Sequence, residues 1–186
     1  MFELRVCGVK EAGDLIQAGW PTRVLSVVSP TLELQWTHGN HQAVRVHDIE
    51  QEIGPGWVLP RDEHLDQALA FTADLNDHDR LIVHCRYGIG RSTAVAIGVC
   101  IQQGMEPEAA YRHVEMIRDF LLPNAAIIEL IDRRFGLNNA LVGLVSRERR
   151  SRMRAMLGVS ASIDSRDDVL AMKSILEDHA KSRIGS

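Results

Sequence analysis

The sequence lacks a long apolar run and a basic excess. No stretch approaches the roughly 18 consecutive apolar residues that a membrane-spanning helix needs. The start of the chain, Met-Phe-Glu-Leu-Arg-Val, lacks the charged and apolar regions of a signal peptide. The formal net charge of -4 argues against nucleic acid or a membrane as the main partner, because proteins that bind phosphate backbones usually carry a basic excess. We therefore expect a cytoplasmic protein.

Cysteine is also scarce, and the three cysteines are Cys7, Cys85 and Cys100. An odd number of cysteines at no metal-like spacing predicts neither a disulfide framework nor a zinc site, and it fits reduced thiols. We expect Cys100 and Cys7 to be core residues. A second hypothesis for Cys7 is that it traps an oxidised Cys85 as a disulfide.

Three histidines lie close together at His38, His41 and His47, but no cysteine or carboxylate near them has the spacing of a metal ligand. We expect solvated loop histidines, and we expect neither a metal nor another cofactor.

The chain has 186 residues, of which 45% are hydrophobic and 25% charged, so it can form one domain with a sizeable core. The hydrophobic pattern predicts strands at residues 2–7, 23–28, 43–47 and 81–83, and helices at residues 10–18, 62–76, 94–103, 107–120 and 125–135. Residues 31–40 fit a loop or a short helix. Strands interleaved with helices, followed by a run of helices, predict an α/β fold. Its central twisted sheet has four to five mostly parallel strands flanked by helices.

From Leu137 onward the composition of the sequence changes, first to a segment rich in arginine and then to small and polar residues. We predict a domain at residues 1–136 and a C-terminal helical extension at residues 137–186, packed on the domain or flexibly attached to it. Five arginines between residues 147 and 154 are expected to form a solvated helix face. A polar linker at residues 158–165 is expected to precede a last amphipathic helix.

Residues 81–93, Leu-Ile-Val-His-Cys-Arg-Tyr-Gly-Ile-Gly-Arg-Ser-Thr, are the stretch most constrained by chemistry. Cys85 and Arg91 enclose five residues, which is the loop length needed to curl backbone N–H groups around one tetrahedral oxyanion. The helix predicted to follow would point its positive dipole end at the same place. The sequence thus predicts a phosphate-binding catalytic loop. Its cradle consists of Arg86, Tyr87, Gly88, Ile89, Gly90 and Arg91.

The loop also supplies the means to activate a cysteine. A free thiol with a pKa near ~8.5 is only ~3% thiolate at pH 7, so a nucleophilic cysteine needs its anion stabilised. The loop N–H groups and the Arg91 guanidinium would favour negative charge on Cys85. Ser92 is placed to donate a hydrogen bond to the sulfur, and His84 could orient the loop through backbone contacts.

Cleavage of a phosphate monoester also needs an acid to protonate the leaving oxygen. Asp48 is the candidate, because it follows a predicted strand and opens a long surface loop that could close over the pocket. Asp62, expected to cap the next helix, is the second candidate. Trp57, in the same loop, either shapes the mouth of the pocket or packs on the body of the domain.

The segment from His84 to Thr93 resembles the His-Cys-X5-Arg-Ser/Thr signature of cysteine-dependent protein tyrosine phosphatases, nearest to the compact dual-specificity branch. In that family the acid is an aspartate on a loop upstream of the cysteine, which Asp48 resembles. The similarity covers roughly residues 4–135 and includes Pro123-Asn124 at a helix start. The chain departs from the family pattern in the Ile-Gly-Pro-Gly-Trp-Val-Leu-Pro stretch after Asp48 and in the tail. Low-molecular-weight tyrosine phosphatases have the opposite order of cysteine and acid.

The resemblance implies a phosphomonoester hydrolase that forms a phosphocysteine intermediate at Cys85 and prefers phosphotyrosine in a protein partner. Two alternatives stay open. One is an inositol-phosphate or phosphoinositide phosphatase, although only Arg86 adds charge between the cysteine and Arg91. The other is a phosphate-binding module without turnover. The sequence leaves the oligomeric state open.

Overall fold

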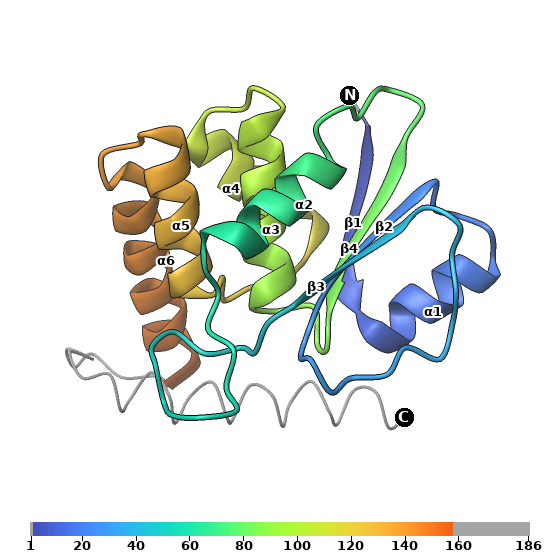
Figure 1. Ribbon diagram of the computed structural model, residues 1–186. Coiled ribbons are helices and arrows are strands. Elements are labelled where there is room, and N and C mark those ends of the chain that lie inside the picture. The colour runs from blue at the N-terminus through green and yellow to red at the C-terminus, as the bar shows by residue number, and fades with distance from the viewer. Residues whose placement is uncertain (1, 158–186) are drawn as a thin grey trace. The chain divides into compact units, whose positions relative to one another are not determined.

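The computed structural model describes residues 2–157 (Figure 1). The chain divides into two compact units, residues 1–142 and 143–186. Helix α6 (Ala140–Leu157) begins in the first unit and continues into the second, and the other described helices and strands lie in the first unit. The predicted boundary after residue 136 stays a prediction, and the linker and last helix predicted beyond residue 157 lie outside the described residues.

The described strands form one four-stranded parallel sheet in the order β1-β4-β2-β3. The strands are β1 (Glu3–Gly8), β2 (Arg23–Val28), β3 (His41–Arg45) and β4 (Arg80–Cys85). Strand β4 lies between β1 and β2, so its end at Cys85 is flanked by Gly8 on one side. The predicted α/β fold with a mostly parallel sheet is confirmed.

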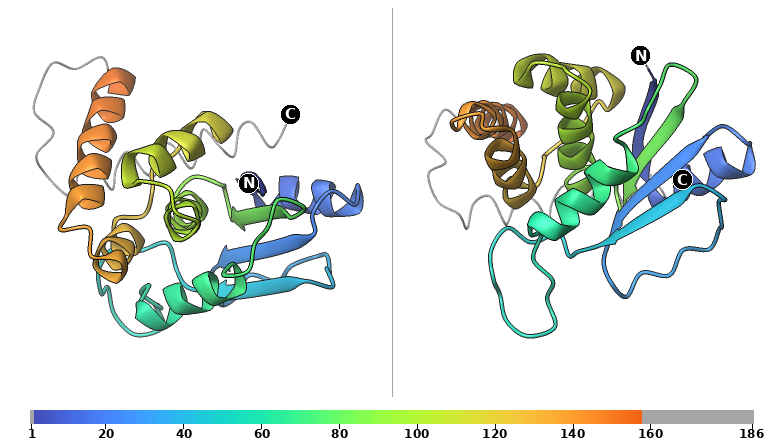
Figure 2. Two further views of the ribbon diagram at one scale, coloured as in Figure 1. Left: turned by 90° about the horizontal axis from the view of Figure 1, so that it is seen from above. Right: turned by 45° about the horizontal axis from the view of Figure 1, so that its top comes forward.

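Helices cover both faces of this sheet. These helices are α1 (Val9–Gln17), α2 (Asp62–Phe71), α3 (Arg91–Gln102), α4 (Pro107–Ile117) and α5 (Ala125–Phe135). Helix α1 lies on one face, and α2, α3, α4 and α5 gather on the other (Figures 1 and 2). Helix α3 is buried along most of its length, and Cys100 within it is a core residue whose pKa burial raises to about 12.

Side chains alternate between the two faces, and this alternation decides where the cysteines lie. Cys7, Val24 and Ile82 pack on the α1 face with Trp36 at its edge. Cys7 is paired with His84 in the β1–β4 ladder, whereas Cys85 is paired with Gly8. Cys7 is thus a buried core residue on the α1 face, and burial raises its pKa above the ordinary value.

Strand β3 lies two residues earlier than predicted. Its ladder with β2 begins at His41, and the chain then leaves it, because the N–H of His47 bonds to the carbonyl of Val58 in the following loop. His41 is therefore a half-buried strand residue, and its prediction as a solvated loop histidine is wrong. Residues 31–40 form turns and irregular chain.

Helix α2 ends at Phe71 and not near Asn76, as predicted. The carbonyl of Phe71 accepts a hydrogen bond from Arg23, and the hydroxyl of Thr72 folds back onto the carbonyl of Ala68. These contacts replace the bonds that a further helical turn would make.

The start of α3 and the end of α4 differ from the prediction, whereas both ends of α5 agree with it. Helix α3 begins at Arg91, three residues before the prediction, because the carbonyl of Gly90 already accepts the N–H of Ala94. Helix α4 ends at Ile117 because Arg118 is extended. The bounds of α5 are those predicted.

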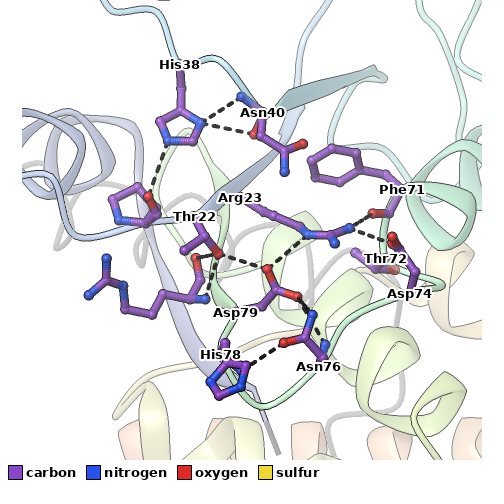
Figure 3. A network of polar contacts seen from close by, with 12 residues as sticks. Thr22, Arg23, His38, Asn40, Phe71, Thr72, Asp74, Asn76, His78 and Asp79 are labelled. Atoms are coloured by element: carbon purple, nitrogen blue, oxygen red, sulfur yellow. Dashed lines mark hydrogen bonds and ion pairs between the residues drawn. The ribbon is translucent and has the colours of Figure 1, made fainter.

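A network of polar side chains joins the segments that lead into β2 and β4 (Figure 3). Asp79 accepts hydrogen bonds from Thr22, Arg23 and the backbone and side chain of Asn76. Burial, the largest influence, acts to raise the pKa of Asp79, but these bonds and the Arg23 charge together hold it below the ordinary value. The network joins the amino-terminal ends of β2 and β4, whereas Cys85 lies at the carboxyl-terminal end of β4.

Among the described residues, no helix is long and apolar enough to cross a membrane.

Candidate active site

The loop between β4 and α3 has its carbonyl groups turned outward. Each is held by a donor: Arg86 O by the N–H of Val9, Tyr87 O and Gly88 O by Arg118, Ile89 O by the N–H of Leu122, and Gly90 O by the N–H groups of Ala94 and Asn124. In a planar trans peptide the C=O and the next N–H point in opposite directions. The N–H groups of residues 87–91 therefore face the concave side of the loop, where an anion would be held.

Gly88 is required in this loop for two reasons. Its φ of +74° lies in the left-handed region, and a Cβ placed on it would lie 2.5 Å from the carbonyl carbon of Cys7 and 2.7 Å from the nitrogen of Gly8. The loop therefore packs directly against the end of β1.

Cys85 lies at the base of this cradle with 2% of its surface exposed. Its Sγ accepts a hydrogen bond from the N–H of Gly88 at 3.2 Å and another from Oγ of Ser92 at 3.2 Å. Burial acts to raise the pKa of Cys85 and is the largest influence, and Asp48 raises it further. The Arg91 charge and the bonds from Ser92 outweigh both, so the pKa lies below that of an ordinary thiol. The site thus favours the nucleophilic thiolate.

Arg91 is 3% exposed and is held by its Nη1, which donates to the carbonyl of Val46 at 2.7 Å and to Oγ of Ser29 at 3.3 Å. Its Nε is buried and has no hydrogen-bond partner in the described structure. Buried donors are nearly always paired in native proteins. An oxyanion in the cradle would supply the acceptor for Nε of Arg91, because a guanidinium can bind two oxygens of one oxyanion with parallel hydrogen bonds.

Asp48 lies over the same loop. Its Oδ2 is 3.8 Å from Nε of Arg91, and a Cβ on Gly90 would lie 2.8 Å from that oxygen. Nδ2 of Asn124 donates to Oδ1 of Asp48 at 2.8 Å and to the carbonyl of Ile49 at 3.2 Å. The carboxylate of Asp48 is thus held beside the loop and Arg91.

The second acid candidate, Asp62, is placed differently. It is the first residue of α2, whose N-cap is Arg61, so the predicted cap at Asp62 is wrong. Its carboxylate is exposed and bonds to Arg133 of α5 at 2.8 Å.

The other predicted site residues surround the loop. Nδ1 of His84 lies 3.3 Å from the carbonyl oxygen of Cys85, and the hydroxyl of Thr93 bonds to the carbonyls of Ile89 and Gly90. The Arg86 guanidinium lies over the ring of Tyr87, 5.4 Å from its centroid, and Arg86 is exposed.

Trp57 is 49% exposed, and its ring contacts that of His47, the neighbour of Asp48, at 4.8 Å between centroids. The loop that carries Trp57 therefore packs beside the candidate acid.

Two residues of the site, Asn124 and Arg118, were not among the predicted site residues. Asn124 follows a proline and precedes an apolar helix, which is a capping signal, but nothing local links it to Asp48. Arg118 donates to the carbonyls of Gly88 and Tyr87, both at 3.1 Å, and pairs with Glu11 of α1. Its position at the end of a helix gave no sign of this role.

Within the described part of the chain, no group of three or more histidine, cysteine or carboxylate side chains could hold a metal ion.

No protein-family model matches the sequence, and neither does any curated protein. Solved structures do match. Human DUSP28 is 20% identical and aligns over 74% of this chain and 94% of its own, with a TM-score of 0.57. A mouse putative dual specificity phosphatase complexed with zinc tungstate is 19% identical over 73% and 83%, with a TM-score of 0.54. The Yvh1 phosphatase domain of Chaetomium thermophilum is 20% identical over 76% and 95%, with a TM-score of 0.53.

The chain therefore has the fold of the dual-specificity phosphatases, as the resemblance of its signature led us to expect. At this identity the comparisons establish the fold, and the chemistry has to be argued from the site itself.

Proposed function

We propose that this protein is a phosphomonoester hydrolase that acts through a phosphocysteine intermediate on Cys85. The observation that carries the proposal is the loop itself. Its carbonyl groups are all bonded outward, its N–H groups face inward, and the sulfur of Cys85 lies among them with two hydrogen bonds and a lowered pKa. This is an anion cradle with a nucleophile at its base.

In the first step the Cys85 thiolate attacks phosphorus, and the bond between phosphorus and the substrate oxygen breaks. Asp48 gives its proton to that oxygen, which leaves as an alcohol or phenol. The inward N–H groups and Arg91 hold the three remaining phosphoryl oxygens and their developing charge.

In the second step water attacks the phosphocysteine, and Asp48 takes a proton from that water. The sulfur–phosphorus bond breaks and inorganic phosphate forms. The Cys85 sulfur then departs as a thiolate, which the hydrogen bond from Ser92 at 3.2 Å stabilises. No cofactor is needed for either step.

The preferred substrate is phosphotyrosine in a protein, with phosphoserine and phosphothreonine as further substrates. The fold shared with dual-specificity phosphatases supports this class. An inositol phosphate carries several negative charges, and a loop that prefers it usually has several cations. Only Arg86 adds positive charge between Cys85 and Arg91, so an inositol phosphate is the second candidate. A cytoplasmic location stays a prediction.

The test is hydrolysis of an aryl phosphate by the wild type, by Cys85→Ser and by the control Cys100→Ala, with tungstate binding measured by calorimetry. Tungstate is a tetrahedral oxyanion like phosphate. We expect turnover in the wild type and the control, and a loss of more than about 10³-fold in Cys85→Ser, which should still bind tungstate. Tungstate binding without turnover in the wild type would point to a phosphate-binding module. Unchanged turnover in Cys85→Ser would overturn the mechanism.

A panel of phosphotyrosine peptides, phosphoserine and phosphothreonine peptides and inositol phosphates then separates the substrate classes. We expect the highest kcat/KM with phosphotyrosine peptides. A higher value with inositol phosphates would replace the protein substrate.

A further inference from the structure

A chain of three polar side chains runs through the α1 face of the sheet to the start of the loop. Nε2 of His41 lies 2.8 Å from Oγ of Ser26, and the same Oγ lies 2.6 Å from Nε2 of His84. Nδ1 of His84 lies 3.3 Å from the carbonyl oxygen of Cys85. Ser26 and His84 are fully buried and face each other as partners in the β2–β4 ladder.

Chemistry allows one direction of donation along this chain. The Cys85 carbonyl can only accept, so His84 carries its proton on Nδ1. Burial, the largest influence, lowers the pKa of His84 to about 4, so at neutral pH the ring is uncharged and its Nε2 accepts. The single hydroxyl proton of Ser26 must then be donated to His84, and Ser26 accepts from Nε2–H of His41.

The surroundings keep both rings in place. The indole of Trp36 meets His41 and His84 edge to face, with centroids 5.1 Å and 5.3 Å apart. Burial, then the charges of His38 and Arg45, lower the pKa of His41. His41 donates from Nε2 in both its neutral and its charged form, so its titration leaves the direction of the chain unchanged.

We propose that Ser26 and His41 are positioning residues for the nucleophile. They hold His84 in its Nδ1–H tautomer, and His84 in turn fixes the carbonyl of Cys85 and the peptide with which the loop begins. The consequence for catalysis rests on the proposed function, whereas the consequence for the tautomer and for the thiolate does not.

Ser26 can position His84 because its hydroxyl donates to Nε2, which disfavours the tautomer with the proton on Nε2. With its hydroxyl removed, Nε2 of His84 is a buried acceptor without a donor, and the 3.3 Å contact with the Cys85 carbonyl is left as the one interaction of His84 described here that favours the Nδ1–H tautomer. The peptide at the start of the loop is then less constrained, and the N–H groups that stabilise the thiolate are less well aligned.

The first test is a nitrogen NMR spectrum of the histidine rings at neutral pH, in the full chain. We expect His84 of the wild type to be the Nδ1–H tautomer, and Ser26→Ala to show a mixture. An Nε2–H tautomer in the wild type would overturn the inference directly.

The second test measures the pKa of Cys85 from the pH dependence of its alkylation, followed by mass spectrometry of the peptide that contains it. We expect Ser26→Ala to raise this pKa by about one pH unit and His41→Leu by less. His41→Gln, whose amide can donate from a similar position, should restore the wild-type value. The control is His78→Leu, an exposed histidine just before the start of β4.

An unshifted Cys85 pKa in Ser26→Ala, with the variant folded as judged by its thermal unfolding, would contradict the inference. So would a Gln variant that behaves as the Leu variant does. Alkylation reads the thiolate without any turnover, so failure of this inference is distinguishable from failure of the proposed phosphatase activity.

Discussion

Asn124 donates a 2.8 Å hydrogen bond from Nδ2 to Oδ1 of Asp48, across 76 residues of sequence. Its Oδ1 accepts the N–H of Ile127 as the cap of α5, and its own N–H bonds to the carbonyl of Gly90. One buried residue, through its side chain and its backbone N–H, thus links the proposed acid, the phosphate cradle and a helix of the core.

Asn124→Ser separates these roles, because serine also caps a helix but has no amide to donate to Asp48. We expect kcat for a phosphotyrosine peptide to fall about tenfold, since a misplaced catalytic group slows the reaction even when binding is intact. The melting temperature should change less than in Asn124→Ala, which loses the cap as well. Equal kcat in Asn124→Ser and wild type would contradict this positioning role.

Replacing Asp48 with Asn tests the acid. Hydrolysis of esters with poor leaving groups should fall about 10²-fold or more, whereas an ester whose leaving oxygen is already a stable anion should lose much less. Steady-state kinetics over a series of aryl phosphates measures this dependence. Asp62→Asn is the matched control and should leave the series unchanged. Equal losses over the whole series in Asp48→Asn would move the acid elsewhere.

Gly88→Ala tests the approach of the loop to β1. The added methyl would meet the backbone of Cys7 and Gly8, so we expect a loss of stability of about 2 kcal/mol or more and loss of tungstate binding. The control is Gly104→Ala, which also has positive φ (+91°) but nothing within 4 Å of the added Cβ. Urea unfolding should show a smaller loss for Gly104→Ala, and similar losses would contradict the collision.

Asp79 makes the stability of the fold depend on pH. Its folded pKa is below the ordinary value, so its contribution is fully present above the unfolded pKa of ~4 and is lost as pH falls through the folded value. We expect Asp79→Asn to lower the free energy of unfolding at pH 7 by about 1–3 kcal/mol. The difference from wild type should shrink in acid.

Urea unfolding from neutral pH to about pH 3 measures this difference. Asp74→Asn, which removes an exposed partner of the same Arg23, is expected to have a much smaller effect. A difference for Asp79→Asn that stays constant over this range would be inconsistent with the assignment.

Those parts of the site that are contiguous in sequence could be predicted. Cys85, Gly88, Gly90 and Arg91 lie within seven consecutive residues. The apolar strand before them and the helix after them predict that these residues form the short loop between the two. The α/β class and the bounds of α5 follow from local periodicity. For α5 the sequence also has Asn124, which caps the first turn, and Gly136, which ends the helix in the left-handed conformation. Helix ends such as Phe71 were missed because distant side chains terminate the helix there.

The tertiary structure decided which distant residues meet. Asp48 meets Asn124, Arg118 meets the carbonyl of Tyr87, and Ser26 faces His84. The contact of Ser26 with His84 depends on the order of the strands and on the register between them, which bring β2 beside β4. The other two contacts depend on where the segment between α4 and α5 packs. Local sequence patterns carry no information on strand order or register, because periodicity specifies which face of a strand is buried but not which strand lies next to it.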